Sequence, residues 1–392
     1  MGEARFGRFL AAMAEEPPVS IRLNPQKCTP AEQTTAEGRC ERVPWCPQGF
    51  YLDQRPNFTF DPLLHAGCYY VQEAASMFVH HVVAQLLPSA PHAALDLCAA
   101  PGGKSTALRT VLPADCLLIS NEPVRQRAQV LNENVQKWGG ANSVVTNNYA
   151  RDFRKAGLVF DLILCDVPCS GEGMFRKDPA SIGEWSPQGV ERCQRLQREI
   201  VEDIWPCLRP GGLLIYSTCT YNTRENEENV RWMEQTLDAQ PLAIATETGW
   251  GITGSLLEGY AAPVCRFIPG LTRSEGLFMA ALRKPGDDAA RPLTGKALAA
   301  KLKGLNVLYT AEPHQPCPTA ELPYPTAIAY LRREAIVLPP DTPRGLVEVC
   351  FKGHRLGLVK NIGTRANNLY PREWAIKTTH VPTTYEGNEV LF

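Results

Sequence analysis

Short apolar segments alternate with amphipathic ones through the middle of the chain, and this alternation constrains the fold more than any other feature. The apolar segments predict strands, and the amphipathic ones, whose apolar residues recur at helical spacing, predict helices. Strands are predicted at 93–100, 115–123, 142–148, 160–170 and 211–221, and helices at 105–112, 124–140 and 190–208. This pattern indicates βαβ units and an α/β fold with a doubly wound parallel sheet. Such a sheet binds its ligands beyond the carboxyl ends of its strands.

The segments on either side of this region predict further domains. Residues 1–90 read as a small, mixed α+β subdomain, with a helix that begins near Gln72. Residues 286–317 are rich in Lys, Leu, Ala and Pro and are predicted to be a linker between the sheet domain (91–285) and a C-terminal domain (318–392). That last domain is predicted to be β-rich because the runs AIAYL, AIVLP, LVEVCFKG and RLGLVKNI are broken by Pro and Gly.

Composition limits the class of protein. Of the 392 residues, 44% are hydrophobic and 21% are charged, which excludes a disordered, collagen-like or fibrous chain. No apolar run reaches the ~18 residues that span a bilayer, and the apolar stretch at the start is too short for a secretory signal. The 14 cysteines form no C-x-x-C pair and no zinc spacing with His, so neither disulfides nor a metal is expected. We expect a soluble, cytoplasmic protein.

Charge is distributed unevenly along the chain. The net charge is −1, but residues 291–392 carry 13 Lys and Arg against 8 Asp and Glu. A basic C-terminal segment fits a nucleic-acid partner. On charge alone, a solvated basic face explains it equally well.

The first predicted strand is followed by a glycine turn and a helix start, Asp96-Leu-Cys-Ala-Ala-Pro-Gly-Gly-Lys104. Glycines let the backbone approach a ligand closely, and a helix N-terminus offers free N–H groups to an anion. The loop is neither a G-x-G-x-x-G motif nor a P-loop, because Cys98 stands where a P-loop requires its first glycine. Glu122 ends the second strand, where an acid can accept hydrogen bonds from ribose hydroxyls. Together these features point to a nucleoside cofactor such as S-adenosylmethionine.

Two cysteines lie at the ends of adjacent predicted strands. Cys169 follows the fourth strand in DVPCSGEGMF, and Cys219 follows the fifth in YSTCTYNTRENEEN. A structural cysteine belongs inside a strand or on a helix face, whereas these two lie in polar loops at the ligand-binding edge. A thiolate is the reactive form, and a nearby cation such as Lys104 lowers the pKa of a thiol.

A cysteine has a specific use in methyl transfer to a pyrimidine. Carbon 5 of cytosine or uracil is a poor nucleophile, and a thiolate that adds to carbon 6 activates it. An acidic group near ring nitrogen 3 then stabilises the developing charge, and Asp166 is suitably placed. A second thiol can assist the elimination that frees the product.

The motifs LDLCAAPGGKST, DVPCSGEGMFRKDP and YSTCTYNTRENEENV resemble those of the Nol/Nop/Sun (RsmB/NOP-type) RNA 5-methylcytosine methyltransferases. SIRLNP and YYVQEAASM resemble the N-terminal subdomain of that family. GLVKNIGTRANNLYPREWAIK resembles the PUA-like C-terminal domain of its RsmF (YebU-like) subgroup, which acts on small-subunit ribosomal RNA. The resemblance implies a Rossmann-like S-adenosylmethionine methyltransferase sheet, 16S rRNA or the small ribosomal subunit as partner, and a monomer.

The resemblance also assigns roles to residues. Cys219 matches the nucleophile, Cys169 the release cysteine, and Asp166 the catalytic acid that also lies at the cofactor. Lys104 matches the motif lysine near both. The cofactor loop comprises Cys98, Ala99, Ala100, Pro101, Gly102, Gly103 and Lys104, with Glu122 as the ribose ligand. Val167 replaces the usual alanine. The acid that commonly contacts the adenine has no clear counterpart, and Asn147 or Asn148 is the substitute we predict.

RNA contacts are predicted in three places. Arg22 and Asn24 are candidates for a phosphate near the active site, with a structural loop role equally open. Arg176 and Lys177 follow Cys169 and are better placed to meet the substrate strand. In the C-terminal signature, Arg365, Asn368 and Arg372 are candidates for phosphates and base edges, beside Trp374 and Tyr370, which can stack on bases. A fold-stabilising network around a buried Trp374 is the alternative there.

Three other functions compete with 16S rRNA methylation. The first is the same chemistry on transfer RNA, because PUA-like domains also occur with that substrate. The second is a non-catalytic ribosome-assembly or RNA-binding factor, which the intact set of cysteines, Asp166 and Lys104 argues against. The third is a small-molecule methyltransferase, which leaves the basic C-terminal domain unexplained.

Overall fold

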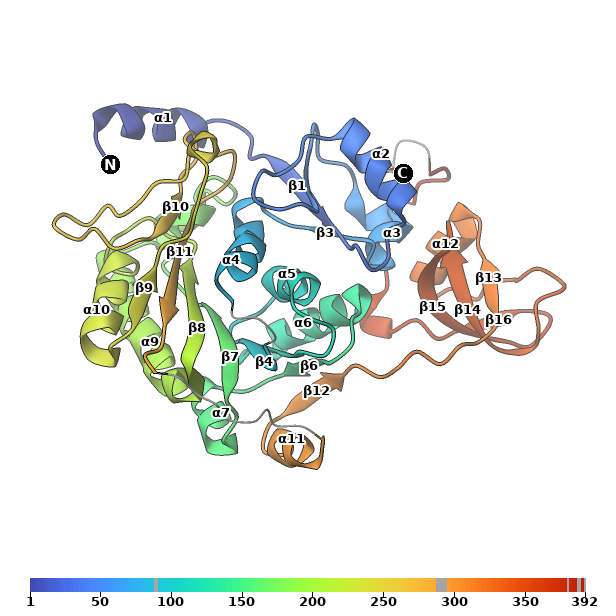
Figure 1. Ribbon diagram of the computed structural model, residues 1–392. Helices are drawn as coiled ribbons and strands as arrows, with labels where there is room; N and C mark the ends of the chain where they lie inside the picture. Colours follow the sequence, from blue (N-terminus) through green and yellow to red (C-terminus); the bar gives the residue numbers. More distant parts are fainter. Residues whose placement is uncertain (88–90, 287–294, 379–380, 386–388, 391–392) are drawn as a thin grey trace.

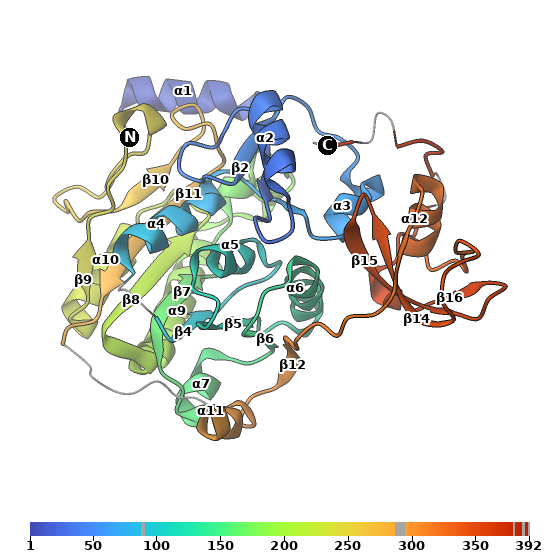
Figure 2. The ribbon, with the colours of Figure 1, turned by 45° about the vertical axis from the view of Figure 1, so that its right-hand side comes forward.

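The computed structural model describes residues 1–87, 91–286, 295–378, 381–385 and 389–390. In these residues the strands form sheets of three, nine and four strands, one for each of the predicted domains (Figure 1). The nine-stranded sheet is the central element, and the two smaller sheets lie together to one side of it (Figure 2).

The five predicted strands of the α/β region form a parallel core in the order β6-β5-β4-β7-β8. The strands are β4 (Ala93–Asp96), β5 (Leu117–Asn121), β6 (Ser143–Thr146), β7 (Phe160–Asp166) and β8 (Leu208–Thr218). The helices of this region are α5 (Gly103–Val111), α6 (Arg125–Trp138), α7 (Ala150–Ala156), α8 (Ser181–Glu184), α9 (Pro187–Ile204) and α10 (Glu227–Leu237). The strand order reverses at β4, so the crevice above the ends of β4 and β7 is the place where such a sheet binds its ligand.

Antiparallel strands extend the sheet at both edges, which the sequence analysis did not predict. On one side lie β9 (Gln240–Leu242), β10 (Cys265–Phe267) and β11 (Leu277–Arg283), and on the other β12 (Val307–Thr310) pairs with β6. The prediction of a linker at 286–317 is therefore wrong in part, because this stretch contains α11 (Gly295–Leu302) and β12. Leu308 and Tyr309 of β12 pack against the apolar side chains of α6. Residues 287–294 of the predicted linker lie outside the described residues.

The N-terminal domain is a three-stranded antiparallel sheet with helices around it. The strands are β1 (Val19–Leu23), β2 (Gly49–Leu52) and β3 (Tyr69–Val71), and the helices beside them are α2 (Pro30–Arg39) and α3 (Pro62–His65). Helix α1 (Glu3–Met13) instead lies over β10, where Arg8 donates to the Gly270 carbonyl (Figure 1). The helix predicted from Gln72 begins later, as a 3-10 turn at Ala75–Met77 followed by α4 (Phe78–Leu86). Helix α4 packs on α5 and joins the core of the central sheet, so it belongs with that sheet rather than with residues 1–90. Residues 88–90, at the predicted boundary, lie outside the described residues.

The C-terminal domain is a four-stranded sheet with one helix. Its strands are β13 (Thr319–Glu321), β14 (Gly345–Phe351), β15 (His354–Asn361) and β16 (Ala366–Asn368), so the runs LVEVCFKG and RLGLVKNI are strands as predicted. The run AIAYL instead lies in helix α12 (Tyr324–Leu331), whose apolar side chains are buried against the sheet and the N-terminal domain. The run AIVLP makes one isolated bridge, between Ile336 and Ala366.

The two smaller domains share one hydrophobic core. Buried side chains of the N-terminal sheet, such as Ile21 and Phe50, belong to the same cluster as Ile328 and Val347 of the C-terminal domain. The Tyr324 hydroxyl donates to the Phe60 carbonyl at 3.1 Å across this contact. The C-terminal domain is thus held at a fixed place beside the central sheet. Within the described residues, no helix is long and apolar enough to cross a membrane, and no cluster of His, Cys, Asp or Glu could hold a metal ion.

Candidate active site

The two strand-end cysteines lie in contact. Strands β7 and β8 are neighbours and pair Asp166 with Ser217, so the loops that follow them start side by side. The Sγ atoms of Cys169 and Cys219 are 3.3 Å apart, and both side chains are partly buried. The parallel pairing of β7 and β8 therefore brings together two residues that are 50 positions apart in the sequence.

The two cysteine loops approach each other more closely than most side chains allow. The Gly173 N–H donates to the Cys219 carbonyl at 2.7 Å. A Cβ atom at position 173 would lie 2.5 Å from the same oxygen, so only glycine fits there without a shift of the backbone. The motif S-G-E-G after Cys169 thus has a steric reason: it lets one loop pass directly against the other.

A lysine–aspartate pair lies beside the thiols. Lys104 Nζ is 2.8 Å from Asp166 Oδ2, and the Ser217 hydroxyl donates to Asp166 Oδ1 at 2.6 Å. Burial lowers the pKa of Lys104, but the Asp166 carboxylate outweighs it and the net shift is upward. Lys104 therefore remains a cation at the centre of the site.

The two thiols have opposite pKa shifts. The hydrogen bond from Cys169 lowers the pKa of Cys219, and the nearby Lys104 cation acts in the same direction against burial and the Asp166 charge. The pKa of Cys169 is raised well above its usual range by its hydrogen bond to Cys219 and by burial. Cys219 is consequently the thiol that ionises first, and Cys169 is the one that keeps its proton.

The glycine loop after β4 forms one wall of a cavity of about 160 Å³ next to these groups. Gly102 has a φ of 117° and starts α5, a conformation that favours glycine. A Cβ at Gly103 would lie 3.3 Å from the Tyr70 ring of the N-terminal domain. The cavity is lined by Tyr70, Val71, Gln72, Glu73, Ser76, Asp96, Cys98, Ala99, Ala100, Pro101, Gly103, Lys104 and Asp166. The loop of the central sheet and the segment after β3 thus enclose it from opposite sides.

Two buried carboxylates near the loop have an oxygen without a hydrogen bond from any described residue. Asp96 Oδ2 accepts from the Ser105 hydroxyl at 2.6 Å, but Asp96 Oδ1 is buried with no partner. Burial raises the pKa of Asp96 to about 7. Glu122 Oε1 accepts from the Val124 N–H at 3.0 Å, whereas Oε2 has no hydrogen bond and lies 3.4 Å from Arg127 Nη2 in an ion pair. An orphaned acceptor such as Asp96 Oδ1 fits the hydroxyl and amino donors of a nucleoside cofactor.

Asp96 is a residue that the sequence analysis left out of the candidate site. The signal was present, because Asp96 is an acid at the end of an otherwise apolar strand.

The side chains of Asn147 and Asn148, the predicted adenine contacts, form hydrogen bonds within the protein. The Asn147 amide donates to the Glu122 and Pro123 carbonyls, and Asn148 bonds the backbone of Asn306. Neither asparagine lines the cavity.

The prediction that Arg22 and Asn24 contact RNA is wrong, because both side chains are fully buried. Arg22 donates to Gln72 Oε1 at 2.7 Å and to the hydroxyl of Thr106 on α5. Asn24 Nδ2 donates to the carbonyls of Gly67 and Trp138 at 3.0 and 2.8 Å. These residues hold the N-terminal domain against α5 and α6, which is the structural role that the sequence had left open.

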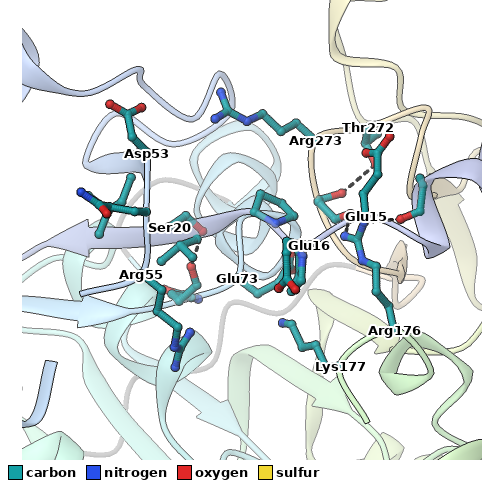
Figure 3. Close-up of a pocket in the computed structure, with 18 of the residues that line it drawn as sticks. Glu15, Glu16, Ser20, Asp53, Arg55, Glu73, Arg176, Lys177, Thr272 and Arg273 are labelled. Atoms are coloured by element: carbon teal, nitrogen blue, oxygen red, sulfur yellow. Dashed lines mark hydrogen bonds between the residues drawn. The ribbon is translucent and has the colours of Figure 1, made fainter. Parts of the chain in front are cut away.

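The side chains of Arg176 and Lys177 differ in their exposure to solvent. Arg176 is buried and forms an ion pair with Glu275 at 2.7 Å, so its charge is already compensated. Lys177 is exposed and points into a cleft of about 970 Å³ between the N-terminal domain and the 270–274 loop (Figure 3). The exposed Arg55 and Arg273 line the same cleft. Because Val71, Gln72 and Glu73 line both this cleft and the smaller cavity, the two lie next to each other.

The residues of the C-terminal domain that were predicted to contact RNA also differ in exposure and hydrogen bonding. Arg365 and Arg372 are exposed, whereas the Asn368 amide donates to the carbonyls of Tyr330 and Glu334 within the domain. Trp374 is half-buried and lies near Lys137 of α6, with Lys137 Nζ 5.4 Å from the ring centroid. This contact places the C-terminal signature against the central domain.

Comparison with known proteins agrees with the domain organisation. The model of 16S rRNA methyltransferase RsmB/F matches residues 83–283. The models of the N-terminal domain and of the PUA domain of RsmF match residues 1–74 and 317–376. Two curated relatives called ribosomal RNA small subunit methyltransferase F, from Escherichia coli O6:H1 and Shigella boydii serotype 18, are each 36% identical over 292 residues. That alignment covers 71% of this chain and 60% of each relative, so the chain spans about three-fifths of their length.

Solved structures show the same fold. A methyltransferase homologue from Pyrococcus horikoshii is 27% identical, with a TM-score of 0.61, over 71% of this chain and 90% of that one. NSun6 from the same organism has a TM-score of 0.60 at 22% identity, over 73% of this chain and 96% of its own. Both the fold and the matched family are those of S-adenosylmethionine-dependent methyltransferases, as the glycine loop predicted. The RsmB/F family model matches more than half of the residues of this chain. The chain therefore belongs to the RsmB/F family of 16S rRNA methyltransferases.

Proposed function

We propose that this chain methylates carbon 5 of a cytosine in 16S rRNA, with S-adenosylmethionine as the methyl donor, through a covalent bond between Cys219 and carbon 6 of the base. The observation that carries the proposal is the contact of two strand-end thiols, 3.3 Å apart, beside the Lys104–Asp166 pair. Methyl transfer to nitrogen or oxygen needs no thiol nucleophile. Two thiols, a cation and a carboxylate at the edge of a methyltransferase sheet fit the carbon-5 reaction.

The cofactor would bind at the cavity beside the glycine loop. The orphaned oxygen of Asp96 in the cavity wall would accept a hydrogen bond from its amino or hydroxyl groups, and Gly102 and Gly103 let the backbone come close. Glu122 lies outside that wall and is paired with Arg127, so we propose it only as a ligand of a part of the cofactor that extends beyond the cavity. Bound S-adenosylmethionine supplies an electrophilic methyl group. The residues of the chain then have to place the cytosine ring between that group and Cys219.

The chemical steps follow from the electrostatics of the site. The Cys219 thiolate adds to carbon 6, and the electron pair of the 5,6 double bond becomes available at carbon 5. Charge that moves towards ring nitrogen 3 would be stabilised by a hydrogen-bond donor to that nitrogen, which is the Lys104 ammonium or Asp166 in its protonated form; Lys104 and Ser217 hold the Asp166 side chain in place. Carbon 5 takes the methyl group and then loses its proton to a base. The S–C6 bond breaks, the double bond re-forms, and Cys169 retains a proton with which it assists the release of Cys219.

The target base has to leave its stack before carbon 6 is accessible. The cleft of about 970 Å³ adjoins the cofactor cavity, and its exposed cations Arg55 and Lys177 can contact phosphates, whereas Arg273 is already paired with Glu41. Arg365 and Arg372 of the C-terminal domain are further exposed cations. The RNA strand would therefore run through the cleft, with the C-terminal domain as an additional contact.

The proposal is tested by transfer of a tritiated methyl group from S-adenosylmethionine to three acceptors, which are unmodified 30S subunits, naked 16S rRNA and bulk transfer RNA. Label in 30S subunits or 16S rRNA, recovered as 5-methylcytidine after digestion, is the expected result. Label only in transfer RNA would overturn the substrate. Label in a nucleoside methylated at nitrogen or oxygen would overturn the cysteine mechanism, and label in 5-methyluridine would overturn the choice of base. If the cofactor binds and no acceptor is labelled, the chain is an RNA-binding factor rather than an enzyme.

A further inference from the structure

A buried carboxylate joins the two cysteine loops. Glu172 lies three residues after Cys169 and is 8% exposed. Its Oε2 accepts from the N–H groups of Tyr221 and Asn222, at 2.7 and 2.9 Å, in the loop of Cys219. Its Oε1 accepts from the Asn222 amide at 3.0 Å. The position of Glu172 is therefore fixed by the backbone just beyond the proposed nucleophile.

The fourth hydrogen bond of Glu172 comes from an exposed tryptophan. The Trp185 indole N–H donates to Glu172 Oε1 at 3.0 Å. The Trp185 side chain nevertheless remains 40% exposed, as do the apolar side chains of Met174 (43%) and Ile182 (54%) in the same segment. An indole that is bound by its N–H and open on its surface is held in one orientation, with area left to contact a ligand.

We propose that Trp185 stacks on the nucleobase next to the target cytosine in the substrate RNA, and that Glu172 is a positioning residue that couples this stacked base to the Cys219 loop. The inference rests on the proposed function and adds a substrate contact to it. Glu172 bonds both the indole and the backbone beyond Cys219, so a base stacked on Trp185 would be linked through one side chain to the Cys219 loop.

A nucleobase is the ligand that this surface fits best. When the target cytosine leaves its stack, the neighbouring base loses a stacking partner, and an exposed indole ring can replace it. Stacking on an aromatic ring is insensitive to sequence, because every base has a π face. The same segment carries Lys177, whose exposed amine points into the cleft and can contact the backbone phosphate of that strand (Figure 3).

Substitutions at Trp185 separate stacking from the hydrogen bond. Trp185→Ala should raise the KM for RNA by roughly 5- to 150-fold, the range expected for the loss of one stacked base. Trp185→Phe keeps an aromatic ring but loses the N–H, so its KM should stay within about threefold of wild type. Trp185→Leu keeps an apolar side chain without a π face and should behave as the alanine variant does. Trp232→Ala is the matched control, because Trp232 is a half-buried tryptophan on α10 whose ring faces Arg198.

Glu172 is tested by a different readout. Glu172→Gln cannot accept all four hydrogen bonds, so the Cys219 loop should lose its fixed position while Trp185 keeps its ring. We expect kcat to fall roughly 10- to 100-fold, as for other misplaced reacting groups, with the KM for RNA changed far less. A purely structural role would lower the thermal midpoint and the yield of active enzyme together, and would leave kcat per folded molecule unchanged.

Ultraviolet cross-linking of the full chain to the RNA that the wild type methylates gives the direct test. Mass spectrometry of the digested complex should find a nucleotide on the peptide that contains Trp185, and Trp185→Ala should remove it. If wild-type enzyme methylates RNA, but the KM of Trp185→Ala matches that of Trp232→Ala and no nucleotide is found there, the stacking inference is overturned and the proposed function stands. If wild-type enzyme methylates no RNA, it is the proposed function that fails.

Discussion

Two regions of the molecule contain buried polar or charged side chains from recognisable motifs. One is the candidate catalytic edge of the sheet, with Asp96 and Glu122, and the other is the seam beneath the N-terminal domain, with Arg22 and Asn24. The two regions differ in how these side chains are hydrogen-bonded. At the seam, the Arg22 guanidinium and the Asn24 amide donate hydrogen bonds to other groups of the protein. At the candidate catalytic edge, one buried oxygen of Asp96 has no partner among the described residues, and one buried oxygen of Glu122 has no hydrogen bond but is paired with Arg127 at 3.4 Å. A motif residue whose hydrogen-bonding groups are all paired within the protein supports the fold. One that keeps an unpaired polar atom beside a cavity is available to a ligand.

The thiols extend this comparison. Most cysteines that the structure describes at buried positions, such as Cys165, have a pKa raised by burial, and they act as small apolar side chains. Cys219 differs because Cys169 and Lys104 together lower its pKa. The contact with Cys169 and the nearby Lys104 therefore distinguish Cys219 from the buried cysteines of the core.

The largest expected effect is at the candidate catalytic edge. Cys219→Ala should abolish methyl transfer, because the neighbouring thiol, Cys169, has a pKa raised well above its usual range and keeps its proton. S-adenosylmethionine binding, measured by calorimetry, should remain within about twofold of wild type, since the cofactor cavity is not lined by Cys219. Methyl transfer within several-fold of wild type would remove Cys219 as the nucleophile.

A substitution at the seam should affect stability instead. Arg22→Met removes a buried cation and leaves the Gln72 and Thr106 oxygens without their donor, so the free energy of unfolding should fall by about 3 kcal/mol. Urea unfolding measures this loss. The salt dependence of RNA binding by the folded variant should be unchanged. A decrease of about one in the slope of log K against log salt would instead identify Arg22 as a phosphate contact.

The pH dependence of cofactor binding tests the orphaned Asp96 oxygen. With a pKa of about 7, Asp96 is protonated below that pH and ionised above it. Only the carboxylate accepts hydrogen bonds at both oxygens, so the affinity for S-adenosylmethionine should rise as the pH increases from 5.5 towards 7, by up to roughly tenfold per unit. Asp96→Asn should be weaker at pH 7.5 and insensitive over the same range. A wild-type affinity that is constant across this range would exclude Asp96 as a ligand of the cofactor.

The smallest effects are expected on the C-terminal domain. Arg365→Ala and Arg372→Ala remove exposed charges that make no ion pair among the described residues. Each should weaken RNA binding by only a few-fold and reduce the salt slope by about one, with little change in kcat. Filter binding at several salt concentrations measures both quantities. Asn368→Ala is the contrasting variant, because its amide bonds the protein, and it should lower stability rather than the slope.

The sequence was sufficient for the parallel core of the sheet and for the candidate catalytic residues. Strand ends on one edge follow from βαβ connectivity, so Cys169 and Cys219 could be placed together without coordinates. It was insufficient wherever distant segments decide the outcome. The run AIAYL is compatible with a strand or a helix, and burial between two domains selects the helix. Whether an arginine such as Arg22 points outward or inward depends on acceptors more than 50 residues away, which no local pattern reveals.

The most direct test of the cysteine mechanism is a search for the covalent intermediate in Cys169→Ala. This variant lacks the thiol that assists release, so it should accumulate a protein–RNA adduct in the presence of S-adenosylmethionine. The adduct should survive denaturation and be visible as a shifted band. Mass spectrometry after nuclease and protease digestion should find a methylated cytidine attached to Cys219. Absence of any adduct while wild type turns over the same RNA, or attachment at a different residue, would contradict the account.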